Sequence, residues 1–186
     1  MKTGLKQRFR MLIGLAVILI IIQLFDTLTG GALSNLGIIP RYSRGLIGIP
    51  LSPFLHGDWG HLFSNLPVLL VLSVLLMAHS IRYYVLASLF IIFMEGTLVW
   101  LFGRTAIHIG ASGWIFGLWG LLLANAFFLR RIKDLFFAIL VFVYYGGIVF
   151  GLLPWQEDIS TEGHIFGVIS GLVFSWLSKR WIIESH

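Results

Sequence analysis

Three apolar stretches of this chain each open with a residue capable of nucleophilic or acid–base chemistry. Ser112 opens one of them within Gly110-Ala111-Ser112-Gly113, and His61 and His164 open the other two. A serine hydroxyl becomes a nucleophile when an imidazole accepts its proton, and such a pair can hydrolyse an amide bond. Whether these groups meet depends on the elements that carry them.

The composition is that of a membrane protein. The chain has 186 residues, of which 58% are hydrophobic and 11% charged, with a mean hydropathy of +0.94. Soluble domains carry about 25% charged residues. The absence of cysteine excludes disulfides and thiolate chemistry. The net charge of +5 does not indicate nucleic acid, because the basic residues cluster at the ends of apolar runs.

We expect an all-α, polytopic fold: a single domain over residues 1–186 with six spanning helices. The apolar runs place these helices at about 9–28, 61–79, 82–102, 112–129, 135–153 and 163–177. The first run is long for a signal peptide and lacks a clear cleavage site, so a retained helix is expected. Residues 29–60 mix Gly and Pro with short apolar patches, which predicts a loop lying in the membrane interface.

The distribution of Lys and Arg predicts the orientation. With both termini in the cytoplasm, ten of the thirteen basic residues fall inside. The runs that open with His61, Ser112 and His164 then all descend from the outer face. They continue for 18, 18 and 15 residues, to His79, Arg130 and Lys179, which corresponds to roughly 27, 27 and 22 Å of helix. All three polar residues should therefore lie at one depth, just beneath the outer surface.

Helical spacing adds neighbours to these residues. Asn65 lies four residues after His61, on the same helix face, and Gly167 lies three residues after His164. Gly113 follows Ser112 directly. Small residues let membrane helices approach closely, so the helices that carry Ser112 and His164 are expected to pack together.

At these positions the sequence resembles the rhomboid family of intramembrane serine proteases. The resemblance is carried by three segments, in order: His56-Gly57-Asp58-Trp59-Gly60-His61-Leu62-Phe63-Ser64-Asn65, Gly110-Ala111-Ser112-Gly113 and Glu162-Gly163-His164-Ile165-Phe166-Gly167. It implies the basic six-helix form of that family. It also implies an endopeptidase that cuts single-span membrane proteins near the outer face of the lipid bilayer, with no cofactor. The compact form implies a bacterial inner membrane, and the oligomeric state is left open.

The resemblance also implies roles for individual residues. Ser112 matches the nucleophile and His164 the general base. Asn65 and His56 match positions that help to bind the oxyanion, and His61 matches the second histidine of that motif. Gly110 matches the glycine before the nucleophile and is grouped with the oxyanion positions. His61 is counted as a supporting residue together with Gly113, Gly167 and Phe116, the last of which stands where many relatives carry a tyrosine packed on the histidine.

Two acidic residues, Glu162 and Glu95, lie near the site or within a predicted span, and their roles are considered next. Since no carboxylate is placed to orient His164, we expect a Ser–His dyad, with Glu162 pointing elsewhere. Glu95 lies within a predicted span and matches no family catalytic position, so we expect a buried structural hydrogen bond there.

Three other functions were weighed. The histidines, among them His56, His61, His108 and His164, could hold a metal or haem, but the five-residue spacing of His56 and His61 does not align them on a helix. We therefore expect no metal. A non-catalytic relative would usually lack the serine or the histidine. A transporter would show broken-helix repeats, which this sequence lacks.

Overall fold

The computed structural model describes residues 2–153 and 159–183, and over these residues every regular element is helical. The α-helices are α1 (Lys2–Leu28), α2 (Gly48–Leu51), α3 (Trp59–Met77), α4 (Ile81–Phe102), α5 (Ser112–Leu129), α6 (Ile132–Tyr145) and α7 (Thr161–Ile183). A 3₁₀ helix, η4 (Gly146–Leu152), continues α6. The all-α prediction is confirmed. The count of six is not, because the described residues form seven α-helices, the short α2 lying within the predicted interfacial loop.

Five segments of the described chain are long and apolar enough to cross a membrane: Gly4–Leu28, Trp59–Met77, Ile81–Phe102, Ser112–Leu129 and Ile132–Leu152. Helix α7 is not among the segments found within the described residues. These segments make the chain an integral, multi-pass membrane protein.

Capping side chains fix where several helices begin and end. Asp58 precedes α3 and accepts a hydrogen bond from the backbone N–H of His61 at 2.8 Å, and Ser80 precedes α4 and accepts one from Tyr83 at 2.9 Å. Each satisfies an N–H that the helix itself leaves unpaired. The carboxylate of Asp26 accepts from the backbone N–H of Leu33 at 2.6 Å, which turns the chain after α1.

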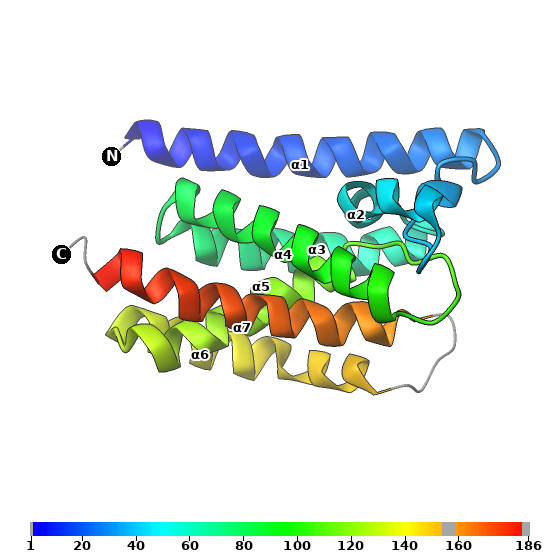
Figure 1. Cartoon of the computed structure of the whole chain (residues 1–186). Coiled ribbons are helices and arrows are strands. Elements are labelled where there is room, and N and C mark those ends of the chain that lie inside the picture. Colours follow the sequence, from blue (N-terminus) through cyan, green and yellow to red (C-terminus); the bar gives the residue numbers. More distant parts are fainter. Residues whose placement is uncertain (1, 154–158, 184–186) are drawn as a thin grey trace.

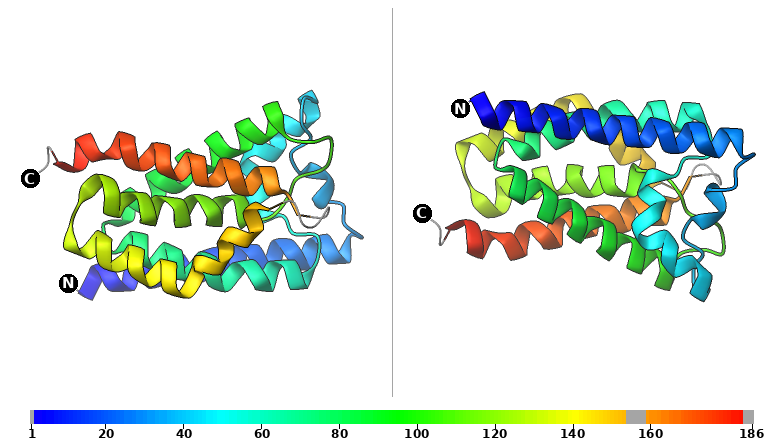
Figure 2. Two further views of the ribbon diagram at one scale, coloured as in Figure 1. Left: turned by 90° about the horizontal axis from the view of Figure 1, so that it is seen from below. Right: turned by 90° about the horizontal axis from the view of Figure 1, so that it is seen from above.

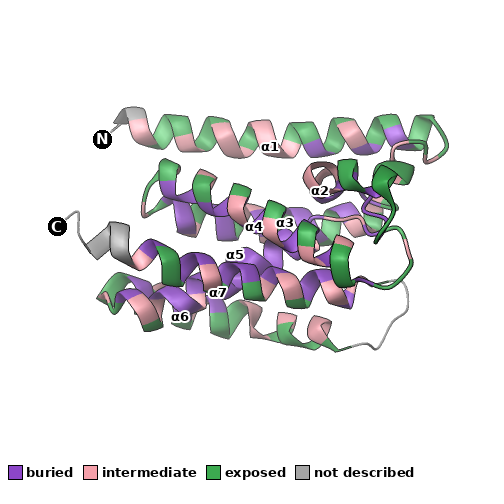
Figure 3. Ribbon diagram, viewed as in Figure 1, coloured by how far each residue is buried: buried purple, intermediate pink, exposed green. Residues whose placement is uncertain are grey.

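Helix α5 forms the centre of the bundle (Figures 1 and 3). In its apolar window 72% of the residues are buried, against 17% for α1 and 11% for α6. Its most extensive contact is with α7, as expected from the glycines. A Cβ on Gly167 would lie 3.2 Å from the backbone nitrogen of Gly117, and one on Gly171 would lie 2.8 Å from that of Leu121. The two backbones therefore approach more closely than any side chain would permit.

The polar loops gather at one end of the bundle, whereas α1 begins and α7 ends at the other (Figures 1 and 2). The loop after α1 is tied to the end of α4. Arg41 donates to the carbonyl of Gly103 at 2.8 Å, and the Trp100 indole donates to the carbonyl of Tyr42 at 2.9 Å. This interfacial segment is thereby held beside the starts of α3, α5 and α7.

Candidate active site

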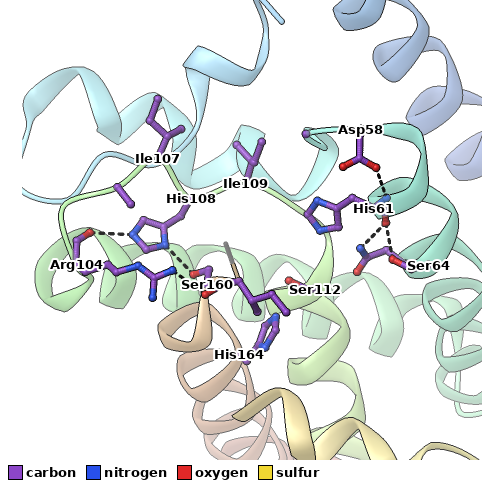
Figure 4. A pocket seen from close by; sticks show the side chains of 14 residues that line it. Asp58, His61, Ser64, Arg104, Ile107, His108, Ile109, Ser112, Ser160 and His164 are labelled. Carbon is purple, nitrogen blue, oxygen red and sulfur yellow. Dashed lines mark hydrogen bonds between the residues drawn. The ribbon is translucent and has the colours of Figure 1, made fainter. Parts of the chain in front are cut away.

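A pocket of about 670 Å³ opens at the loop end of the bundle, where α3, α5 and α7 begin (Figure 4). Its lining includes Ser112, His164, His61 and Asn65. Figure 4 shows Ser112 between His61 and His164. The three polar residues that the sequence places at one depth thus face one cavity.

Ser112 is the first residue of α5 and is half-buried. Within the described residues no side chain caps this helix, so the N–H groups of its first turn remain available as donors beside the hydroxyl. Ser112 Oγ itself makes no hydrogen bond within the described part of the chain. The hydroxyl is therefore free to turn toward His164 or toward a bound carbonyl.

Gly110 is restricted to glycine for two reasons. Its φ of +119° lies in a region that residues with a side chain rarely adopt. A Cβ there would also lie 2.7 Å from Cε1 of the His61 ring and 3.8 Å from Ser112 Oγ. The glycine that the motif places before Ser112 thus makes room for the His61 ring against the backbone.

His164 is buried and held from two sides. Its Nδ1 lies 2.7 Å from the carbonyl oxygen of Gly151 on η4. Because a carbonyl can only accept, Nδ1 carries the proton and Nε2 keeps its lone pair, as a general base requires. The Phe116 ring stacks on the imidazole with a centroid distance of 4.0 Å and an interplanar angle of 8°. The expected aromatic support is therefore present.

Of the two histidines in the His56–Asn65 segment, His61 rather than His56 reaches the pocket. Asn65 also lines it, donating one amide hydrogen to the carbonyl of His61 at 2.7 Å. His56 is fully buried behind them, and its Nε2 accepts from the backbone N–H of Ala111 at 3.3 Å. Burial, reinforced by the neighbouring His61, lowers the pKa of His56 from 6.5 to about 4. His56 thus supports the backbone before Ser112 and does not face the cavity, which departs from the sequence-based expectation.

Two loops close over the outer wall of the pocket, a feature that sequence reasoning missed. Arg104, before α5, pairs with Glu162 of α7 at 3.3 Å and donates to the carbonyl of Ile159 at 2.7 Å. His108 Nδ1 lies 2.7 Å from Ser160 Oγ, and burial lowers the pKa of this histidine. Glu162 therefore points away from His164, as expected. The one available signal was the opposite charge of Arg104 and Glu162, which does not identify partners 58 residues apart.

Within the described residues no three His, Asp or Glu side chains lie close enough to hold a metal ion together. His56 and His61 contact each other edge to face, with ring centroids 5.0 Å apart, and do not converge on a common point. The pocket lining supplies hydroxyl, imidazole and amide groups, together with the carboxylate of Asp58 and the guanidinium of Arg104.

Known proteins are similar to this chain in sequence. The rhomboid domain family matches residues 43–181, a range that contains Ser112, His164 and the rest of the pocket. Uncharacterized proteins of Mycobacterium bovis and Mycobacterium tuberculosis are 35% identical over 169 residues, which cover 86% of this chain and 70% of each relative. An uncharacterized protein of Mycobacterium leprae is 32% identical over 191 residues, covering 95% of this chain and 76% of its own. The chain therefore belongs to the rhomboid family, a family of intramembrane proteases.

Proposed function

We propose that this chain is an intramembrane serine endopeptidase in which Ser112 and His164 act as a catalytic dyad. The observation that carries the proposal is the state of His164. The Gly151 carbonyl fixes its proton on Nδ1, Phe116 holds the plane of its ring, and His164 lines the same pocket as Ser112. In this dyad a backbone carbonyl and a stacked ring do what a carboxylate does in a triad.

The reaction would proceed in two halves. Ser112 Oγ attacks the scissile carbonyl carbon while His164 Nε2 takes the hydroxyl proton, and a tetrahedral intermediate forms. Its collapse breaks the C–N bond, and His164 returns the proton to the departing amine, leaving an ester on Ser112. Water, deprotonated by His164, then hydrolyses that ester, which releases the new carboxyl terminus and restores the serine.

Negative charge develops on the carbonyl oxygen and needs donors. Asn65 retains one amide hydrogen after its bond to the His61 carbonyl, and the His61 ring lies against Gly110 beside the hydroxyl. The first-turn N–H groups of α5 add donors at the positive end of a helix dipole. We therefore assign the oxyanion to Asn65, His61 and the start of α5, with Gly110 making the room.

The substrate we propose is a single-span membrane protein that is cut near the outer face. The pocket opens at the loop end of the bundle, opposite the end where α1 begins. The excess of Lys and Arg near the start of α1, after α5 and near the end of α7 assigns that opposite end to the cytoplasm. Both termini would then be cytoplasmic, and the setting would be a bacterial inner membrane.

The direct test uses purified protein in lipid with a single-span substrate. We expect Ser112→Ala and His164→Ala each to abolish cleavage while leaving the thermal unfolding temperature near that of the unaltered protein. Ser170→Ala is the matched control, since this buried serine of α7 bonds only within its own helix, to the carbonyl of Phe166. Labelling with a serine-directed phosphonate, followed by peptide mapping, should find the adduct on Ser112. Full cleavage by Ser112→Ala would refute the mechanism.

A further inference from the structure

Glu95 is an ionisable side chain in the middle of α4 that the proposed dyad does not use. It is 6% exposed, and it reaches from α4 to the starts of both α5 and α7. Its Cδ lies 2.8 Å from where a Cβ on Gly113 would stand, and its Oε1 lies 3.1 Å from the corresponding point on Gly163. These two glycines are the immediate neighbours of Ser112 and His164.

The Glu95 carboxyl group packs against its neighbours without a polar interaction. Within the described residues it has no hydrogen bond and no ion pair, so the structural hydrogen bond expected from the sequence is not formed. A carboxyl group buried in hydrocarbon is expensive. Its place here therefore requires a function other than polar anchoring.

The contacts of α4 with α5 and α7 indicate that function. One turn further into the bundle, the Ile91 side chain of α4 packs against Gly117 of α5. At the catalytic end Glu95 takes the corresponding place and contacts Gly113 and Gly163 together. A Cβ on Gly113 would also lie 3.3 Å from the carbonyl oxygen of Gly163, so the two backbones meet at this level and the Glu95 side chain supports both helix starts from the α4 side.

We propose that Glu95 is a positioning residue that holds Ser112 and His164 in register by acting as a wedge against both Gly113 and Gly163 from the α4 side. It acts by its size, through the two helix starts, and does not touch the substrate. The inference rests on the proposed protease function. Displacing catalytic groups by about 1 Å can cost on the order of 100-fold in rate.

Kinetics of three variants test the wedge. We expect Glu95→Ala to lower kcat by about 10- to 100-fold with KM changed less than about twofold. Glu95→Gln, which keeps the size and cannot ionise, should retain kcat within about threefold and leave its pH profile unchanged. Thr97→Ala is the control on the same helix, because Thr97 is exposed and bonds only to the carbonyl of Phe93. Unchanged kcat in Glu95→Ala, or equal losses in the Gln and Ala variants, would overturn the proposal.

A double-mutant cycle with Gly113 tests the contact without relying on cleavage. Gly113→Ala should lower the unfolding temperature, since its new Cβ meets the Glu95 carboxyl, and Glu95→Ala should remove much of that loss by making room. In the active protein, adding Glu95→Ala to Gly113→Ala should likewise restore part of the kcat that Gly113→Ala loses. If the unaltered protein neither cleaves nor labels at Ser112, the proposed function fails. The unfolding temperatures of the two single variants and the double variant still test the contact between Glu95 and Gly113. If the losses of the single variants simply add in the double variant, the wedge proposal is refuted.

Discussion

The bundle contains two polar layers, one at each end, built from the same kinds of side chain. We call them the outer and the inner layer after the orientation proposed above. The outer layer, around Ser112, His164, His61 and Asn65, faces a pocket of about 670 Å³. The inner layer lies near the end where α1 begins and joins the α3–α4 turn to α4, α5, α6 and α7. Its members are His79, Tyr83, Asn125, Asp134, Ser175 and Ser178.

In the inner layer the side chains bond to one another. Asn125 Oδ1 accepts from the Tyr83 hydroxyl at 3.0 Å and from the Ser175 hydroxyl at 2.8 Å. His79 pairs with Asp134 and stacks on Tyr83 with centroids 5.3 Å apart. Asn125 and Asp134 are at most 1% exposed. The hydrogen-bonding groups of this layer therefore hold helices together.

In the outer layer several of these groups are left facing the cavity. Ser112 Oγ has no partner among the described residues, His164 Nε2 keeps its lone pair, and Asn65 keeps one amide hydrogen. Residue type alone does not separate a site from a structural network. What separates them is where the unused bonding capacity lies. Nδ2 of Asn125, Oδ2 of Asp134 and Nδ1 of His79 also lack partners, but they are buried, whereas the unused groups around Ser112 face a cavity that a ligand can enter.

The largest effect should come from an outer-layer donor. We expect Asn65→Ala to lower kcat by about 10²–10³-fold, because the developing oxyanion loses a hydrogen bond. The free energy of unfolding should fall by no more than about 1.5 kcal/mol, the usual value of one hydrogen bond. Steady-state kinetics and thermal unfolding of the same preparation measure both. A stability loss without a rate loss would place Asn65 with the inner layer.

Asp134 of the inner layer should give the opposite result. Asp134→Ala leaves the buried His79 ring without its partner, so the free energy of unfolding should fall by about 1–3 kcal/mol. Cleavage per folded molecule should stay within about threefold of the unaltered enzyme, because no bond of Asp134 reaches the pocket. A large rate loss in Asp134→Ala would mean that the layers are coupled.

His56 belongs to the outer end but is buried behind the pocket, so its titration should affect stability. Its pKa is lowered to about 4 by burial, then by His61, and the unfolded chain binds the proton more tightly. Burial of the neutral His56 ring therefore contributes fully to the free energy of unfolding above pH 6.5, and this contribution is lost as the pH falls toward 4. Between pH 7.5 and 5 the loss should be on the order of 2 kcal/mol. His56→Gln should remove that part of the pH dependence in thermal unfolding. An unchanged slope would show that the ring is accessible to water.

The sequence predicted the outer layer better than the inner one, for a physical reason. Ser112, His61 and His164 stand at the openings of apolar runs, so helix length alone places them at one depth. Asn125 and Asp134 stand at helix positions whose partners depend on how four helices rotate about their axes. Periodicity does not determine that rotation, and these residues were not singled out.

The same limit explains the corrections within the site. Helix spacing indicated His61, and the resemblance indicated His56 as an oxyanion position, but in the structure the His61 ring lines the pocket beside Gly110 and His56 does not. Glu95 was correctly predicted to be buried, whereas its lack of a partner depends on two glycines from other helices. The Gly151 carbonyl carries no side-chain signal at all. Its contribution becomes visible only when η4 is placed against α7.

The smallest effect we expect concerns the ring that stacks on His164. Phe116→Leu keeps an apolar side chain but removes the parallel face 4.0 Å from the imidazole. Stacked aromatic pairs contribute about 0.5–1.5 kcal/mol beyond their buried area, which predicts a loss of roughly 2- to 13-fold in kcat. Phe116→Tyr should keep the stacking and the rate. Because the Gly151 carbonyl still orients Nδ1, neither variant should abolish cleavage. A loss as large as that of Asn65→Ala would mean that stacking, rather than the Gly151 hydrogen bond, holds the imidazole in its reactive orientation.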